Sequence, residues 1–347
     1  MAAILRNFQS VLAFKKNIFF LLIPFLLLVS CAERESSRTE FALGTVCSIT
    51  LYDQGQKEVY DSIFSRIREI ENLMSINIKS SDVSRINSNA GIEAVQVHED
   101  TFKVIERAVY FARLSGGAID PSVGPLVSLW GFGRENQNIP AQDKIDEILP
   151  LINWHNIKLD FQTRSVFLEQ KGMTLDLGAI AKGYAADEAA RIAAESGIKR
   201  ALIDLGGNIV LLGERPDKNP WRVGIQNPGK DRGQILGVLH TRKHTVVTSG
   251  IYERFFEEDG RHYHHLFDPS NGYPAENGLL SATVITGNSM DADALSTAVF
   301  ILGYEKGNAL VNSLPSADAV FVFEDRSIRV TPGVNLILTD NSFTIKN

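Results

Sequence analysis

The stretch Leu-Asp-Leu-Gly-Ala-Ile-Ala-Lys-Gly-Tyr-Ala-Ala-Asp, residues 175–187, joins a predicted strand to the start of a predicted helix. Its two glycines permit a tight entry into that helix, which we expect from 180 to 196. Amides at a helix N-terminus favour anions, and Lys182 adds a mobile cation suited to phosphate. Asp176 could accept hydrogen bonds from a polar ring. Any one of these residues is more commonly a helix cap or a solvated charge, but their clustering favours an anion site.

Outward from this stretch, the pattern of apolar residues predicts three more helices and a series of strands. The helices are expected at 57–75, at 101–115 and from about 290 to 302, where Gly303 would end the last one. The strands are expected at 200–205, 209–213, 221–226, 235–240, 245–249, 280–286 and 319–324. Short turns between them favour antiparallel pairing, and the alternation of a doubly wound fold is missing. The sequence predicts an α+β fold with mixed, largely antiparallel sheets and packed helices in one composite domain.

Amino-acid composition and net charge limit the classes of function that this protein can have. The chain has 347 residues, 44% of them hydrophobic and 22% charged, which is typical of a folded globular protein. Its formal net charge of −6 is opposite to that of a nucleic-acid binder, so we expect no nucleic-acid partner.

The N-terminus has the features of a lipoprotein signal peptide, residues 1–30. An apolar run at 18–29 is too short to span a membrane as a helix, and Leu-Val-Ser-Cys ends it in a lipobox at Cys31. A short membrane anchor or a buried helix explains this order of features less well. We therefore expect lipid on Cys31, a tether over 31–39, a domain over 40–347, and a location on the extracytoplasmic side of a bacterial membrane.

Only Cys47 remains beside the lipidation site. It lies in an alternating strand-like pattern, which predicts a small buried hydrophobe rather than a nucleophile.

Asp293 and Thr297 are spaced four residues apart on a predicted helix and therefore share one face. With a backbone carbonyl, their oxygens would suit Mg²⁺. Helix capping by both aspartates is the alternative, and Asp291, which faces elsewhere, is expected either to cap the helix or to support a metal ligand.

Two further segments carry polar residues. Residues 115–133 are dense in Gly and Pro and contain no P-loop, so a ligand-binding loop and a structural turn are equally compatible with them. Residues 261–274 contain His-x-His-His but lack further ligands for a closed zinc site. A histidine near Asp268 is the better candidate for a general base. On a strand, His262 and His264 would share one face and His265 the other.

In this order, these segments resemble the ApbE family of flavin transferases (FAD:protein FMN transferases). The resemblance covers nearly the whole mature chain, and its matches are Leu43-Gly44-Thr45, 116–133, 176–187, Thr248-Ser249-Gly250, 265–274 and 293–297. The family often has Met where this chain has Leu43, and an aromatic residue near Asn77.

The resemblance implies Mg²⁺-dependent transfer of FMN from FAD to a Thr or Ser hydroxyl of an acceptor protein, with release of AMP. If water attacks instead, FAD is hydrolysed to FMN and AMP. It implies His265 as the base and Asp293, Thr297 and the carbonyl of Ala179 as metal ligands. The family positions that contact FAD correspond to Leu43, Asn77, Ala118, Ile119, Asp120, Asp176, Lys182 and Phe267. The expected partners are FAD, an acceptor protein and the membrane through Cys31. The alternative is a lipid-anchored flavin-binding or flavin-delivery protein without turnover.

Overall fold

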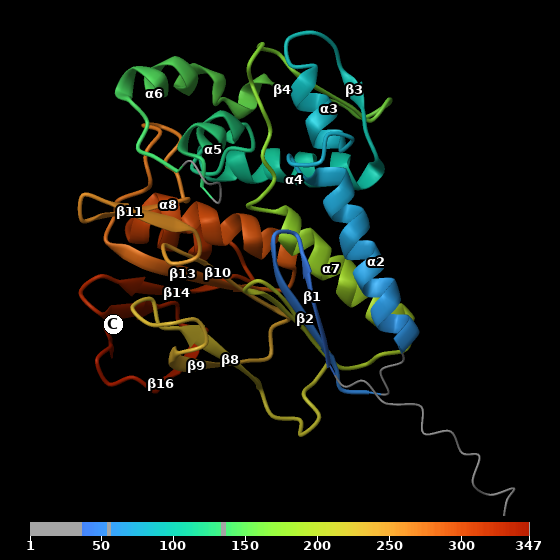
Figure 1. Cartoon of the computed structure of the whole chain (residues 1–347). Coiled ribbons are helices and arrows are strands. Elements are labelled where there is room, and N and C mark those ends of the chain that lie inside the picture. The colour runs from blue at the N-terminus through green and yellow to red at the C-terminus, as the bar shows by residue number, and fades with distance from the viewer. Residues whose placement is uncertain (1–36, 54–56, 133–136, 347) are drawn as a thin grey trace, which may run out of the picture. The chain divides into compact units, whose positions relative to one another are not determined.

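A nine-stranded sheet forms the centre of the fold (Figure 1). The computed structural model describes residues 37–53, 57–132 and 137–346. The strands of this sheet are β1 (Ser37–Ala42), β2 (Thr45–Leu51), β6 (Ala201–Leu205), β7 (Asn208–Leu212), β10 (Thr245–Gly250), β13 (Leu279–Thr286), β14 (Asp318–Phe323), β15 (Ser327–Val330) and β17 (Thr344–Ile345). They lie in the order β1-β2-β6-β7-β10-β13-β14-β15-β17. All neighbours pair antiparallel except β15 and β17, which confirms the largely antiparallel prediction.

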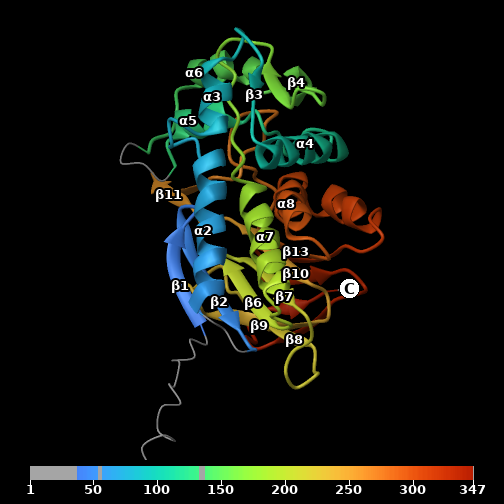
Figure 2. The same ribbon diagram turned by 90° about the vertical axis from the view of Figure 1, so that its right-hand side faces the viewer.

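Three helices cover one face of this sheet: α2 (Lys57–Met74), α7 (Ala181–Glu195) and α8 (Ser289–Asn312) (Figures 1 and 2). Alternate sheet residues such as Val247, Val284 and Phe321 are buried in the core that these helices share. The apolar stripe predicted for α2 is buried along its whole length. Amphipathic periodicity therefore located both the helix and its inward face.

The opposite face of the sheet carries a second core. It packs against a three-stranded sheet of β8 (Trp221–Gln226), β9 (Ile235–Thr241) and β16 (Asn335–Leu338), in the order β16-β9-β8. Val246, Ile285 and Val320, the chain neighbours of residues that face the helices, point into this second core. The fold is therefore three-layered, and both faces of the large sheet are covered.

A smaller helical region lies beyond one end of the large sheet, at the top of Figure 1. It contains α3 (Asp82–Ser88), α4 (Glu99–Leu114), α5 (Gly124–Trp130), α6 (Gln142–Ile148), the 3-10 turns η2 (Leu149–Leu151) and η3 (Trp154–Asn156), and a sheet of β3 (Val95–Gln96), β5 (Ser165–Leu168) and β4 (Ile157–Asp160). The hairpin of β11 (Phe255–Glu258) and β12 (Arg261–His264) is a separate two-stranded sheet. Together with the layers described above, this region belongs to one compact unit.

One predicted boundary is wrong. Residues 37–39, which we expected in the tether, form the first half of β1 because they pair with β2 in register. The helix that we expected to end at Gly303 does leave helical geometry there (φ 72°, ψ 178°), and a second helical segment, which the label α8 includes, continues to Asn312. The Asn277 side-chain amide donates to the carbonyls of Phe300 and Ile301 at 2.6 and 3.4 Å, at the end of the first segment.

The expected signal peptide, Cys31 and the rest of the tether lie outside the described residues. Within the described part of the chain, no helix is both long and apolar enough to cross a membrane. Cys47 is fully buried on β2, and burial raises the pKa of its thiol to about 11, as expected of a core residue rather than a nucleophile.

Candidate functional site

The predicted anion and metal segments meet where α7 and α8 begin. The Asp293 side chain lies in the first turns of α8, is buried (3% exposed) and accepts a hydrogen bond from the Gly183 amide at 2.9 Å. Its other carboxylate oxygen lies 3.5 Å from the ammonium of Lys182, which also donates to the Gly178 carbonyl at 3.0 Å. Residues more than a hundred positions apart in the chain thus share one charged centre.

Hydroxyl groups surround this carboxylate. Thr297 lies one helical turn beyond Asp293, and its Oγ1 is 3.1 Å from Oγ of Ser249 on β10. Ser249 also contacts the Ser296 hydroxyl at 2.9 Å. This donor set of carboxylate and hydroxyl oxygens is the chemistry that Mg²⁺ prefers. Ala179 precedes α7 in the same turn as Gly178. The Lys182 ammonium is the positive charge that lies beside Asp293.

Three or more His, Cys, Asp and Glu side chains do not gather into a metal-binding group anywhere among the described residues. A magnesium site here would therefore need hydroxyl and backbone oxygens beside the one carboxylate.

The start of α7 offers fewer free amides than its sequence predicts. The amides of Ile180 and Ala181 donate to the Leu177 carbonyl at 3.1 and 2.9 Å, and Gly183 donates to Asp293. The turn before the helix supplies these partners. Lys182, with its side chain 25% exposed, is therefore the candidate anion-binding group at this end of the helix.

The glycine-dense segment forms a turn and then a helix, α5, which we had not predicted. Asp120 organises the turn: its carboxylate accepts from the Ser122 amide at 2.8 Å, the Ser122 hydroxyl at 2.6 Å and the Trp154 amide at 3.0 Å. Burial raises the pKa of Asp120 despite these bonds. Ala118 is half-buried and Ile119 is buried beside it. The turn thus has a fixed path.

Asp176 joins this turn to the start of α7. Its amide donates to the Pro121 carbonyl at 2.9 Å, and its side chain accepts from the Gly178 amide at 2.7 Å. The half-buried Asp176 thus contacts the 118–122 turn through its backbone and the turn before α7 through its side chain.

His265 follows β12 directly. Its Nδ1 lies 3.2 Å from the Arg254 carbonyl, which can only accept a hydrogen bond, so Nδ1 carries the proton and Nε2 presents a lone pair. The poorly hydrated position of the ring, followed by the Arg254 guanidinium, lowers the pKa of His265 to about 3. His264 and Lys182 act in the same direction. The imidazole is therefore neutral near pH 7, and its charged environment includes the Lys182 ammonium.

The two neighbouring histidines are tied into the fold. His264 is buried (6% exposed), with Nδ1 accepting from the Leu266 amide at 3.2 Å and Nε2 3.2 Å from the Ala275 carbonyl. Burial lowers its pKa to about 4. His262 lies 3.0 Å from the Ile251 carbonyl through Nε2. These contacts favour structural roles for both rings.

The hairpin turn before β2 lies beside the same segment. Leu43 and Gly44 both have positive φ angles, 53° and 67°, as a two-residue hairpin requires. A side chain added at Gly44 would lie 3.7 Å from the Arg254 guanidinium. Leu43 is half-buried against the main core, so the turn borders the strand end that carries His265.

Two expected flavin positions lie differently. Phe267 is 4% exposed, and its ring centroid is 5.7 Å from that of Trp130 and 5.5 Å from that of Phe132, so its ring belongs to an aromatic core. Asn77 is exposed in the turn after α2, with its amide bonded to the Ser75 hydroxyl at 3.2 Å. Both assignments stay predictions.

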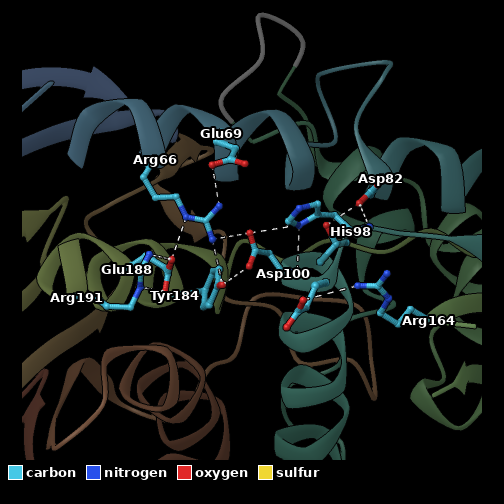
Figure 3. Close-up of polar contacts among 11 residues, drawn as sticks. Arg66, Glu69, Asp82, His98, Asp100, Arg164, Tyr184, Glu188 and Arg191 are labelled. Carbon is cyan, nitrogen blue, oxygen red and sulfur yellow. Dashed lines mark hydrogen bonds and ion pairs between the residues drawn. The ribbon is translucent and has the colours of Figure 1, made fainter. Parts of the chain in front are cut away.

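Sequence reasoning missed a polar network behind α7 (Figure 3). Arg66 on α2 donates to Asp100 of α4 at 2.6 Å and to Glu188 of α7 at 3.0 Å. The Tyr184 hydroxyl, two residues after Lys182, donates to the same Asp100 carboxylate at 2.6 Å. Three helices are thereby joined next to the site, through contacts that no local sequence pattern encodes.

Comparisons with known proteins agree with this geometry. A model of the ApbE family matches residues 43–321. The chain is 38% identical to an FAD:protein FMN transferase of Treponema pallidum over 318 residues, which cover 87% of this chain and 88% of that protein. It is 38% identical to one of Klebsiella pneumoniae over 296 residues, which cover 85% and 92%.

Solved structures are similar as well. The ApbE protein from Thermotoga maritima matches with a TM-score of 0.77 and 34% identity over 88% of this chain and 97% of that one. The flavin transferase ApbE from Vibrio cholerae matches with a TM-score of 0.75 and 27% identity over the same shares.

Proposed function

Because the chain belongs to the ApbE family, we propose that it is a flavin transferase that moves FMN from FAD to a Thr or Ser hydroxyl of an acceptor protein, with Mg²⁺ and with release of AMP. The observation that supports this reaction best is the charged centre at the start of α7 and α8. There, Asp293 and Lys182 lie with Thr297, and the Lys182 charge reaches the His265 imidazole.

The pyrophosphate of FAD is the part of the substrate that this centre would hold. Phosphoryl transfer depends mainly on positioning and on neutralising charge. Among the described residues, Lys182 bonds Asp293 and the Gly178 carbonyl, at 3.5 and 3.0 Å, and it can turn toward a phosphate when another cation takes the carboxylate. The fixed 118–122 turn and Asp176 border the same place and would orient the rest of FAD.

The donor set fits Mg²⁺, with Asp293, Thr297 and the carbonyl of Ala179 as protein ligands. When bound there, the ion would stabilise negative charge on the pyrophosphate oxygens. Asp293 keeps its orientation through the Gly183 amide, and the Ser249 hydroxyl orients that of Thr297.

His265 would accept the proton of the attacking hydroxyl at Nε2, since Nδ1 is committed to the Arg254 carbonyl. Burial is the largest cause of the low pKa of His265, and the Arg254 and Lys182 cations add to it. An anionic pyrophosphate beside Lys182 would oppose the contribution of that cation and so raise the pKa. Water in place of the acceptor hydroxyl would give FMN and AMP.

A lipid-anchored flavin-binding or delivery protein without turnover is the second candidate, because the same contacts would also bind FAD. The test is to incubate the protein with FAD and Mg²⁺, with and without a panel of Thr- and Ser-containing acceptor peptides, and to measure AMP. Transfer predicts AMP release that acceptor accelerates and EDTA abolishes. FAD binding without AMP under every condition would favour the delivery protein.

We also propose that Cys31 is lipidated and holds the enzyme on the extracytoplasmic face of the membrane. The support is the order of basic, apolar and Leu-Val-Ser-Cys segments before residue 32. Cys31→Ala should move the protein from the detergent phase to the aqueous phase in a partitioning experiment. Equal partitioning of the variant and the wild type would contradict the anchor.

A further inference from the structure

The two helices that meet at the site, α7 and α8, each donate backbone amides to a carboxylate of the other helix. Asp187 lies four residues after Gly183 and so shares its face of α7. Its Oδ1 accepts from the Ser289 amide and its Oδ2 from the Met290 amide, both at 2.9 Å. In return, Asp293 of α8 accepts from the Gly183 amide of α7 at 2.9 Å. Each helix thereby receives a carboxylate from the other at its N-terminal amides.

These reciprocal hydrogen bonds lie where the backbones of α7 and α8 are in close contact. A Cβ atom added to Gly183 would lie 2.7 Å from the Met290 Cα. Ser289 and Met290 are themselves buried, at 0% and 7% exposed. Amides in such a place need partners within the protein, and Asp187 supplies both. Asp187 therefore supplies two of the hydrogen bonds that set the position of the first turn of α8 relative to α7.

The α8 helix does not need Asp187 in order to form. Asn288 is its N-cap and accepts from the Asp291 amide at 3.0 Å. Asp291 in turn is held by Arg107 of α4 through two bonds of 2.7 Å. Asp187 adds a different function, because its bonds join α8 to α7 rather than to itself.

The surroundings of Asp187 disfavour the charged form of its carboxyl group. Burial raises the pKa of its carboxyl to about 6 even though two amides donate to it, and the Asp291 carboxylate adds to the rise. Lys103 of α4 acts in the opposite direction, and the nearby Arg107 is already paired with Asp291. This half-buried carboxylate thus holds two amides of the other helix although its surroundings disfavour its charged form.

We propose that Asp187 is a positioning residue: it holds the first turn of α8, and with it the Asp293 carboxylate, at the distance from Lys182 and Gly183 that a divalent cation and the FAD pyrophosphate require. The inference rests on the proposed function, in which Asp293 is a metal ligand. Groups that orient metal ligands typically change metal affinity by about 10- to 100-fold when they are removed. Asp187 does not touch the reacting atoms, so its loss should weaken Mg²⁺ binding much more than it slows transfer at saturating Mg²⁺.

The test measures FAD binding by flavin fluorescence as a function of Mg²⁺ concentration. In Asp187→Ala the Mg²⁺ concentration for half-maximal effect should rise by about 10- to 100-fold. The transfer rate at saturating Mg²⁺ should stay within a few-fold of wild type. Asp187→Asn, which keeps one acceptor oxygen, should fall in between and serves if the alanine variant does not fold.

Asn288→Ala is the matched control, since it also removes a hydrogen bond from an amide of the first turn of α8 but none between the helices. Its Mg²⁺ dependence should equal that of wild type. An unchanged Mg²⁺ dependence in Asp187→Ala, or an equal shift in Asn288→Ala, would overturn the positioning role alone. FAD binding that ignores Mg²⁺ in the wild type would overturn the proposed metal site and this inference together.

Discussion

Replacing Gly183 with alanine has two opposite effects on the free energy of unfolding. Gly183 lies inside α7, where alanine normally favours the helix by about 1 kcal/mol. Here the new methyl group would lie 2.7 Å from the Met290 Cα and as close to the Ser289 carbonyl carbon, both of them backbone atoms. The helices must therefore separate, and the 2.9 Å bond from the Gly183 amide to Asp293 would lengthen or break.

The magnitude follows from these contacts. Overpacking against backbone costs about 1–3 kcal/mol. Loss of a buried hydrogen bond to a charged group costs about 1.5–3 kcal/mol. After the propensity gain, we expect Gly183→Ala to lower the free energy of unfolding by about 2–5 kcal/mol and to weaken Mg²⁺-dependent FAD binding.

Denaturant unfolding of the FAD-free protein, followed by circular dichroism, measures this change. Gly287→Ala is the control, because nothing lies within 4 Å of its added Cβ and its φ is not positive. We expect that variant to stay within about 0.5 kcal/mol of wild type. A Gly183→Ala protein as stable as wild type, or more stable, would refute the close contact between α7 and α8.

Three further predictions address the chemistry and the network behind the site. His265→Ala should slow FMN transfer by about 10²–10⁴-fold while FAD still binds, whereas His262→Ala should do much less; a His265→Ala rate within a few-fold of wild type would remove the base assignment. Asp293→Ala should abolish Mg²⁺-dependent turnover and weaken FAD binding to a smaller degree, and full Mg²⁺-dependent activity in that variant would place the metal elsewhere. Burial disfavours the charged form of Asp100, but bonds from Tyr184 and Arg66 outweigh it and lower its pKa, so the stability it contributes is present above pH ~4 and is lost as pH falls through the lowered value. Asp100→Asn should therefore cost about 1–3 kcal/mol near neutral pH and flatten the acid limb of a stability–pH curve, and an unaltered acid limb would contradict this role.

Local sequence patterns predicted much of the fold. The stripe of Ile and Met side chains predicted α2 to within a residue, and the predicted strand 221–226 coincides with β8. Gly303 was correctly identified as a break in helical geometry, but the second helical segment after it and the Asn277 amide that bonds the Phe300 carbonyl were not predicted. The sequence around Gly303 does not contain that information.

For the site too, the sequence predicted some features and missed others. The spacing of Asp293 and Thr297 predicted a shared helix face, and the two residues lie in one oxygen-rich centre. The function of Asp187 was missed because its partners are more than a hundred residues away and are backbone amides. The low pKa of His265 likewise depends on burial first and then on Arg254 and Lys182, which folding brings near. Charge environment and interhelical contacts are properties of the folded chain.

Mass spectrometry of an acceptor peptide tests the central claim most directly. The peptide carries one Thr and is incubated with the enzyme, FAD and Mg²⁺. Transfer predicts a peptide heavier by one FMN minus water, with the modification on the Thr hydroxyl and one AMP formed per modified peptide. The product should form about 10²–10⁴-fold more slowly with His265→Ala and not at all in EDTA. Formation of AMP and free FMN without any modified peptide, for every Thr or Ser acceptor offered, would contradict the claim of transfer.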